Sequence, residues 1–185
     1  VKTLTKNNMV EEGFPGSFDN IFESIMREEE AVKSSQPSPE SFKNVFEKIL
    51  KDGNEVLCIT ISSSLSGTYN SAILAAKMCE SEKITVIDSR AAAQLTLLGI
   101  EKAVEMAESG ASRQEIAEEY KRISDSSAEI FVPVTLKYLI RGGRIGGVNA
   151  IIGSLLHVKP LLSFKDGVLT AKRKIIGMGK AIKAI

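Results

Sequence analysis

A dense run of small hydroxyl side chains occupies residues 62–68, directly after the apolar stretch 56–61. The run holds four serines, one glycine and one threonine, and the apolar spacing that follows it predicts a helix. In an α/β fold this order places hydroxyls and free backbone N–H groups at the carboxyl edge of a parallel sheet. A helix N-terminus at that edge favours a negatively charged group. The run therefore predicts a site for a carboxylate or a small phosphate.

Two other interpretations of the same run stay open. The glycine is not followed by lysine and the spacing differs from a P-loop, so a nucleotide is not the natural ligand. The serines are also compatible with a turn that only caps its helix. A serine hydrolase is a further alternative because Ser66-Gly67 follows a strand, although the Gly-x-Ser-x-Gly elbow is missing and the only histidine, His157, has an apolar, strand-like context.

Alternating helical and strand patterns lie on both sides of the Ser-rich run at 62–68, and the elements that they predict would position this run. A second buried strand is predicted at 83–89. Helices are predicted at 18–26, 39–50, 92–108 and 113–123, with Ser38 as an N-cap before Pro39 and a capping box formed by Ser112 and Glu115. This alternation predicts an α/β fold with a parallel sheet and helices on both faces.

The pattern changes near residue 126. Residues 130–136 resemble a strand interrupted by Pro133, and the stretches 160–164 and 168–171 flank Lys165-Asp166-Gly167, a strong hairpin signal. We therefore expect an α/β domain at 1–125, which carries the Ser-rich turn, and a smaller α+β domain with antiparallel strands at 126–185. The chain begins at Val1 and stops inside a helical pattern, so we expect an excerpt that lacks the first strand of one domain and truncates the other.

Composition excludes little. The chain has 185 residues, 43% hydrophobic and 25% charged, with a formal net charge of +1, which gives no reason to expect nucleic acid or an acidic membrane surface as a partner. We expect neither a signal peptide nor a membrane span, because the sequence shows no apolar run of the necessary length. Cys58 and Cys79 have no metal-binding or redox spacing, and we expect buried thiols, a cytoplasmic location, no metal and no cofactor.

Five blocks in order carry a family resemblance. They lie at 34–38, 63–72, 86–89, 136–145 and 155–162, with Asp166-Gly167 downstream. On these blocks the chain resembles the DegV family of bacterial fatty-acid-binding proteins. The resemblance implies two α/β domains that bind one long-chain fatty acid, such as palmitate, between them. In many bacteria such proteins present the carboxyl group to a separate fatty acid kinase, which makes an acyl phosphate for phospholipid synthesis.

The resemblance also implies a set of carboxylate-binding residues: Ser34, Ser66, Gly67, Thr68 and Arg144. Ser34 stands where the family usually has a threonine. Serine keeps the hydroxyl of threonine and lacks its methyl group. The family's opening Asp-Ser-Thr segment and its late histidine segment have no match here, and His157 does not correspond to that histidine. The expected function is non-catalytic fatty acid binding. The alternatives are the hydrolase and a dihydroxyacetone-kinase-like small-ligand binder, which needs a ligand-binding histidine in a loop.

A fatty acid needs donors for its carboxylate and an apolar slot for its tail. Charge-assisted hydrogen bonds contribute about 1.5–3 kcal/mol each, and each buried CH₂ about 0.8 kcal/mol. Candidates for the slot are Ile145, Val148, Ile151 and Ile152, most of which we expect to be ordinary helix core. Asp88 is expected to cap a helix or hold a loop, and Arg141 to be a surface charge. For Arg144 the alternatives are a solvated turn residue or a pair with Asp88.

Overall fold

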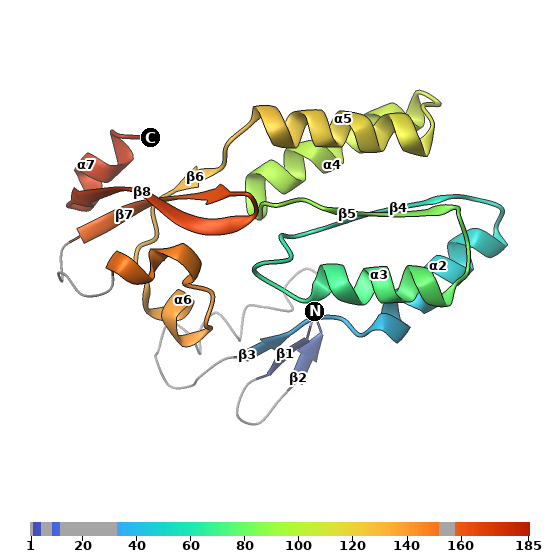
Figure 1. Cartoon of the computed structure of the whole chain (residues 1–185), viewed down its shortest axis with the longest axis horizontal. Coiled ribbons are helices and arrows are strands. Elements are labelled where there is room, and N and C mark those ends of the chain that lie inside the picture. The colour runs from blue at the N-terminus through green and yellow to red at the C-terminus, as the bar shows by residue number, and fades with distance from the viewer. Residues whose placement is uncertain (1, 5–8, 12–32, 152–157) are drawn as a thin grey trace.

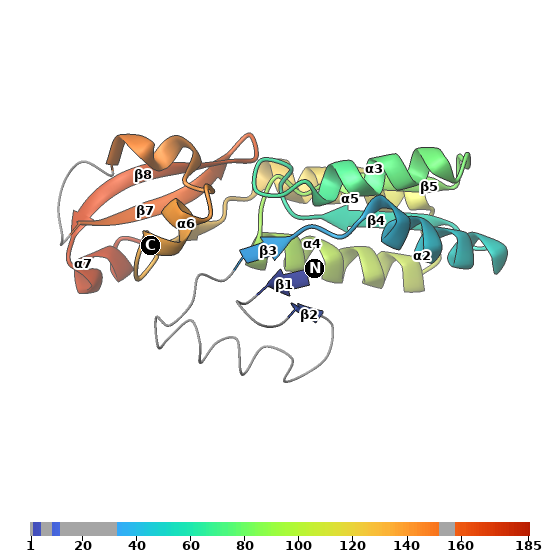
Figure 2. The same cartoon turned by 90° about the horizontal axis from the view of Figure 1, so that it is seen from below.

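A computed structural model of the chain describes residues 2–4, 9–11, 33–151 and 158–185 (Figure 1). The helix expected at 18–26, His157 and Ile152 lie outside these described residues. Figure 2 shows the segment 158–182, coloured orange to red, at one end of the molecule, and the layers of helices and strands formed by residues 39–126 at the other.

A parallel pair of strands forms the centre of the first unit. β4 (Val56–Thr60) pairs with β5 (Ile84–Asp88) in a register that runs from Val56 opposite Ile84 to Thr60 opposite Asp88. Helices α2 (Pro39–Lys51) and α3 (Thr68–Met78) lie on one face, and α4 (Ala93–Glu108) and α5 (Arg113–Ser126) on the other (Figure 1). The predicted α/β fold with helices on both faces is confirmed.

Small and aromatic side chains fill the core between α2, α3 and the sheet. Ala72 and Ala75 of α3 are fully buried, and they pack in one cluster with Phe46 and Val56. Alanine at these positions lets the two helices approach closely, and the aromatic ring of α2 fills the remaining space.

The predicted helix starts are confirmed by their caps. The Ser38 side chain accepts a hydrogen bond from the Ser41 backbone N–H at 3.2 Å, and Pro39 lies in the first turn of α2. Ser112 and Glu115 form a complete capping box at the start of α5. This helix continues past the predicted end at Ile123 to Ser126.

The sequence pattern predicts no strand around Ser34, and the structure differs there. β3 (Lys33–Ser35) is a short strand that pairs antiparallel with β1 (Lys2–Leu4), and β1 also pairs with β2 (Met9–Glu11). Ser34 lies opposite Thr3 in this sheet. Backbone pairing with β1 outweighs the low strand propensity of a Lys-Ser-Ser sequence.

The second unit contains an antiparallel sheet in the order β6-β7-β8, formed by Ile130–Phe131, Val158–Lys165 and Val168–Ile176. The predicted hairpin is confirmed, with Asp166 and Gly167 in its turn at φ angles of 51° and 80°. β6 is shorter than the expected strand at 130–136 because Pro133 has no N–H to continue the pairing. The division between domains expected at residue 126 falls at the end of α5 and stays a prediction.

Short helices cover this sheet. α6 (Lys137–Arg141) and the 3-10 helix η1 (Gly146–Ile151) lie beside a core of Ile145, Val148, Leu162 and Leu169. α7 (Met178–Ile182) packs against β7 and β8. Among the described residues β8 pairs with β7 alone, and Lys172, Arg173 and Lys174 are exposed along it. None of the described helices is both long and apolar enough to cross a membrane.

Candidate functional site

The Ser-rich turn connects the carboxyl end of β4 to the start of α3. The Ser62 backbone N–H donates to the Ala91 carbonyl at 2.8 Å, which ties the turn to the loop after β5. The Ser62 carbonyl accepts hydrogen bonds from the N–H groups of Leu65 at 3.0 Å and Ser66 at 3.2 Å. These bonds fold the turn on itself and fix Ser66 beside the first residue of the helix.

Ser66 and Thr68 form a pair of hydroxyls at this helix start. Their oxygens Oγ and Oγ1 lie 2.8 Å apart, and the Thr68 N–H donates to Ser66 Oγ at 3.3 Å. The N-cap residue, Gly67, supplies no side chain, and the first turn of α3 contains no acidic residue. The hydroxyls and the helix dipole at this position suit a negatively charged group.

Gln36 brings the segment after β3 against the same helix start. A Cβ on Gly67 would collide with the Gln36 side-chain amide, and Gln36 Nε2 donates to Ser71 Oγ at 3.2 Å. Ser34, two residues before Gln36, is exposed in β3. The sequence did not single out Gln36; the available signal was its place inside the matching block at 34–38.

Arg144 reaches the turn from the second unit. Its Nε donates to the Leu65 carbonyl at 3.2 Å, and its guanidinium also donates to the Gly142 carbonyl. The guanidinium is exposed and lies beside the residue that precedes Ser66. The structure therefore brings Ser66, Thr68 and Arg144 to one turn, although they come from two units.

Asp88 and Arg141 lie where they were expected. Asp88 Oδ1 accepts hydrogen bonds from the N–H groups of Ser63 at 3.1 Å and Arg90 at 2.9 Å, so this carboxylate holds two loops together. Arg141 is exposed at the end of α6. Arg144 was expected as a possible partner of Asp88, but in the structure its side chain donates to the Leu65 carbonyl instead.

The side chains named for the tail slot are core residues where the structure describes them. Ile145 and Val148 are buried in the cluster with Leu162 and Leu169. Both side chains pack in this core against the sheet of the second unit.

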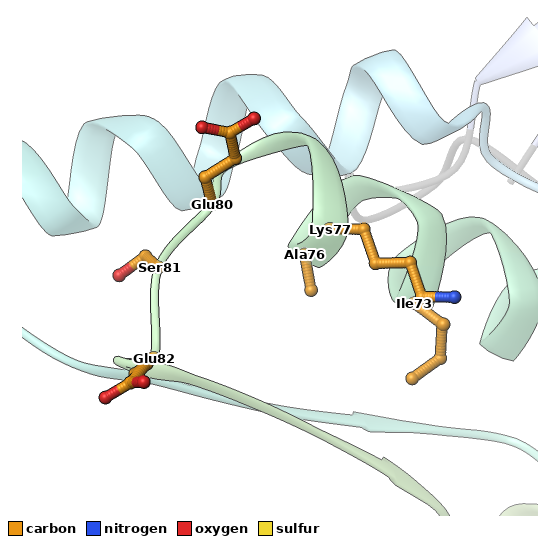
Figure 3. Close-up of a pocket in the computed structure, with 6 residues that line it drawn as sticks. All are labelled: Ile73, Ala76, Lys77, Glu80, Ser81 and Glu82. Atoms are coloured by element: carbon orange, nitrogen blue, oxygen red, sulfur yellow. The ribbon is translucent and has the colours of Figure 1, made fainter.

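Two hollows occur elsewhere among the described residues. A pocket of about 380 Å³ lies beside the carboxyl-terminal half of α3, away from the start of the helix at Thr68 (Figure 3). It is lined by Ile73, Ala76, Lys77, Glu80, Ser81 and Glu82. The wall of this hollow is mostly apolar, but the hollow is shallow and open to solvent, so it would leave much of an aliphatic tail in water. A second pocket of about 200 Å³ adjoins Gly167 and is lined mainly by polar residues such as Arg90 and Asp125.

The two cysteines are free thiols that favour the neutral form. Burial raises the pKa of the Cys58 thiol in β4 to about 11. Burial also raises the pKa of Cys79 at the end of α3, and the neighbouring Glu47 carboxylate adds to the increase. Within the described ranges no group of three or more His, Cys, Asp or Glu side chains is placed to hold a metal.

The chain is an α/β protein with a candidate anion site at a strand-to-helix turn, and comparison with known proteins identifies its family. The model of the family described as "Uncharacterised protein, DegV family" matches residues 4–185. The chain therefore belongs to the DegV family, which confirms the resemblance seen in the five sequence blocks.

Individual relatives agree with this assignment. A DegV domain-containing protein of Caldanaerobacter subterraneus is 39% identical over 89% of this chain and 59% of its own length. A DegV family protein from Thermus thermophilus, described for its fatty acid binding, matches with a TM-score of 0.87 and 35% identity over 100% of this chain and 65% of its own.

A third relative is the fatty acid kinase B3 protein of Streptococcus pneumoniae, solved with linoleic acid. It matches with a TM-score of 0.85 and 26% identity, over 99% of this chain and 66% of its own. This chain spans 60% or slightly less of the length of the first curated relatives it matches.

Proposed function

We propose that this chain binds a long-chain fatty acid such as palmitate without catalysing a reaction. The observation that carries this proposal is the convergence of the Ser66–Thr68 hydroxyl pair and the Arg144 guanidinium on one turn. Ser66, Thr68 and Arg144 would hold the carboxylate, the Gly67 backbone would allow its close approach, and Ser34 would complete the set from β3. The fatty acid binding described for the Thermus thermophilus relative supports this assignment.

The charge distribution supports an anionic ligand. Residues 126–185 hold ten of the 24 Lys and Arg side chains and only two of the 23 Asp and Glu side chains. The second unit is therefore positive, and a carboxylate placed at its contact with the first unit is electrostatically favoured.

The proposal includes a partner and a location. The Streptococcus pneumoniae relative carries the name of a fatty acid kinase protein, and by analogy we assign this chain the task of presenting its fatty acid to a separate kinase for phospholipid synthesis. A cytoplasmic location is part of the same proposal because Cys58 and Cys79 are free thiols.

The serine hydrolase alternative gains no support from the turn. A nucleophilic serine needs a base as its hydrogen-bond partner, whereas the hydroxyl of Ser66 lies against the hydroxyl of Thr68. The dihydroxyacetone-kinase-like alternative requires a ligand-binding histidine, and the only histidine, His157, lies outside the described residues.

Mass spectrometry of the purified full-length protein tests the function. Organic extraction is expected to release a long-chain fatty acid in stoichiometric amount. Protein that contains no fatty acid, takes up none when palmitate is added and hydrolyses model esters would overturn the proposal. An Arg144→Ala variant with lower occupancy would link the ligand to the turn.

A further inference from the structure

The hydroxyls of the Ser-rich turn are divided between two sets of partners. Ser66 and Thr68 contact each other, whereas Ser62 and Ser64 both donate to the carbonyl of Gly167 in the β7–β8 turn. Ser62 Oγ lies 2.6 Å from the Gly167 oxygen, and Ser64 Oγ is also within hydrogen-bond distance of it. The second unit therefore touches the turn through the tip of its hairpin.

The donors and acceptors in this contact are consistent with one another. Each serine hydroxyl has a single hydrogen, and the two oxygens also lie 3.1 Å from each other, so one of these hydrogens is shared between the Gly167 carbonyl and the neighbouring hydroxyl. The remaining acceptor capacity of Ser62 Oγ is used by the Ser64 N–H at 3.3 Å. Ser62 is fully buried and Gly167 is buried, so the carbonyl depends on these two hydroxyls rather than on bulk water.

Glycine is required at the tip for this approach. A Cβ on residue 167 would lie 3.1 Å from Ser62 Oγ and 3.5 Å from the Cα and Cβ atoms of Arg90. Gly167 also has a φ of 80°, which side-chain-bearing residues rarely adopt. The tip thus packs directly on the loops that follow β4 and β5.

Ser62 connects this contact to the candidate ligand site. Its hydroxyl binds the hairpin tip, while its carbonyl accepts the hydrogen bond from the Ser66 N–H. Arg144 adds a second link between the same two units through the Leu65 carbonyl. A shift of the hairpin tip would therefore move the backbone that positions Ser66.

We propose that Ser62, Ser64 and Gly167 form a hairpin latch that fixes the second unit against the ligand-binding turn. Ser62 and Ser64 are positioning residues: they hold Ser66 and Arg144 at a constant separation and do not contact the ligand. The effect of the latch on ligand retention rests on the proposed fatty acid function, whereas its effect on the two units does not.

The test compares three variants of the full-length protein: Ser62→Ala/Ser64→Ala, Ser64→Ala and, as control, Ser63→Ala. Ser63 is exposed in the same turn, and it contacts Asp88 through its backbone N–H, which the substitution keeps. Ser64 is also exposed, so its single variant keeps the fold even if the double variant is unstable. Spin labels on Lys121→Cys in α5 and Lys183→Cys after α7, with Cys58 and Cys79 replaced by alanine, report the separation of the units.

We expect broader label distances in both latch variants and about tenfold faster loss of bound palmitate in the double variant, the effect of one lost buried hydrogen bond. The Ser63→Ala control is expected to match the wild type in both measurements. Unchanged label distances in the double variant would overturn the latch. Broadened distances together with palmitate loss at the wild-type rate would overturn the proposed effect of the latch on the ligand. A wild-type protein that binds no palmitate would refute the fatty acid function, while the label distances would still decide the latch.

Discussion

Hydrogen-bond partners give the hydroxyls of one turn different roles. Ser62 and Ser66 are four residues apart, yet one hydroxyl is buried against the Gly167 carbonyl and the other faces Thr68 at a helix start. Burial makes the first a structural donor. The second is half-buried and remains open to a ligand.

Replacement of Ser66 by alanine is expected to weaken fatty acid binding. Loss of one charge-assisted hydrogen bond to the carboxylate should cost about 1–2 kcal/mol, while the fold stays intact because the Ser66 backbone bond to Ser62 is kept. Calorimetric titration with palmitate measures the change, and circular dichroism checks the fold. Wild-type affinity in the Ser66→Ala variant would remove this residue from the site.

Ser34→Thr tests the other hydroxyl that the family resemblance names. Threonine keeps the donor, and an exposed position in the short strand β3 accepts a β-branched residue. Palmitate affinity measured by the same titration is expected to be unchanged or slightly higher. A clear loss of affinity would contradict the place given to Ser34.

The Cys58 thiol is expected to make the protein less stable in alkali. Because burial raises its pKa from 9.0 to about 11, the thiol ionises in the unfolded chain first. Its contribution to stability is complete below pH 9 and is lost as the pH rises towards 11. Urea unfolding across this range measures the slope, and Cys58→Ala should flatten it; an unchanged slope would show that this thiol is not the cause.

At the scale of the elements, capping decides where the helices begin. Ser112 Oγ accepts from the Glu115 N–H at 3.3 Å, while the Ser112 N–H donates to the Glu115 carboxylate at 2.8 Å. These bonds satisfy groups that the first turn of α5 would otherwise leave unpaired.

Ser112→Ala is therefore expected to destabilise the protein by about 1 kcal/mol. Ser126→Ala, at the other end of α5, serves as the control with a smaller effect, since its hydroxyl donates only to the Ile123 carbonyl. The hydrogen bonds from the Ser112 hydroxyl and N–H lower the pKa of the Glu115 carboxyl. The contribution of the capping box is thus present above the unfolded pKa and lost as the pH falls, a dependence that thermal unfolding should find reduced in the variant.

Local signals explain how much of the fold was predictable. Two helix starts were predicted from Ser38-Pro39 and from the Ser112–Glu115 pair, and the hairpin was predicted from Lys165-Asp166-Gly167. Each of these signals depends only on residues close in sequence. The strand at Ser34 was missed because its only support is pairing with β1. The contact of Gly167 with Ser62 was missed because it also joins residues far apart in the sequence. The hairpin turn and the Ser-rich run are each visible in the sequence, but no sequence rule predicts that they meet.

At the scale of the whole molecule, two units with separate cores meet at the Ser-rich turn. One core lies between α2, α3 and the parallel strands, and the other lies under β7 and β8. Hydrogen bonds from Ser62, Ser64 and Arg144 cross between the units. The candidate site thus depends on how the units are held together, which composition and local pattern do not encode.

Limited proteolysis is expected to separate the units. Ser126 ends α5, and Ser127 and Ala128 follow it before β6; all three are exposed, so a protease of broad specificity should cut there first. Mass spectrometry of the fragments should place the cut close to residue 126. An initial cut at the exposed Gly110 between α4 and α5 would argue against the predicted division.

The cationic sequence along β8 bears on self-association. Unpaired backbone groups at the margin of a sheet invite a neighbouring molecule to extend it, which is the first step toward fibrils. Lys172, Arg173 and Lys174 are consecutive there, so two molecules aligned strand to strand would set one row of positive charges against another. That repulsion opposes aggregation through this strand, and a polypeptide rich in aspartate or glutamate would not experience it.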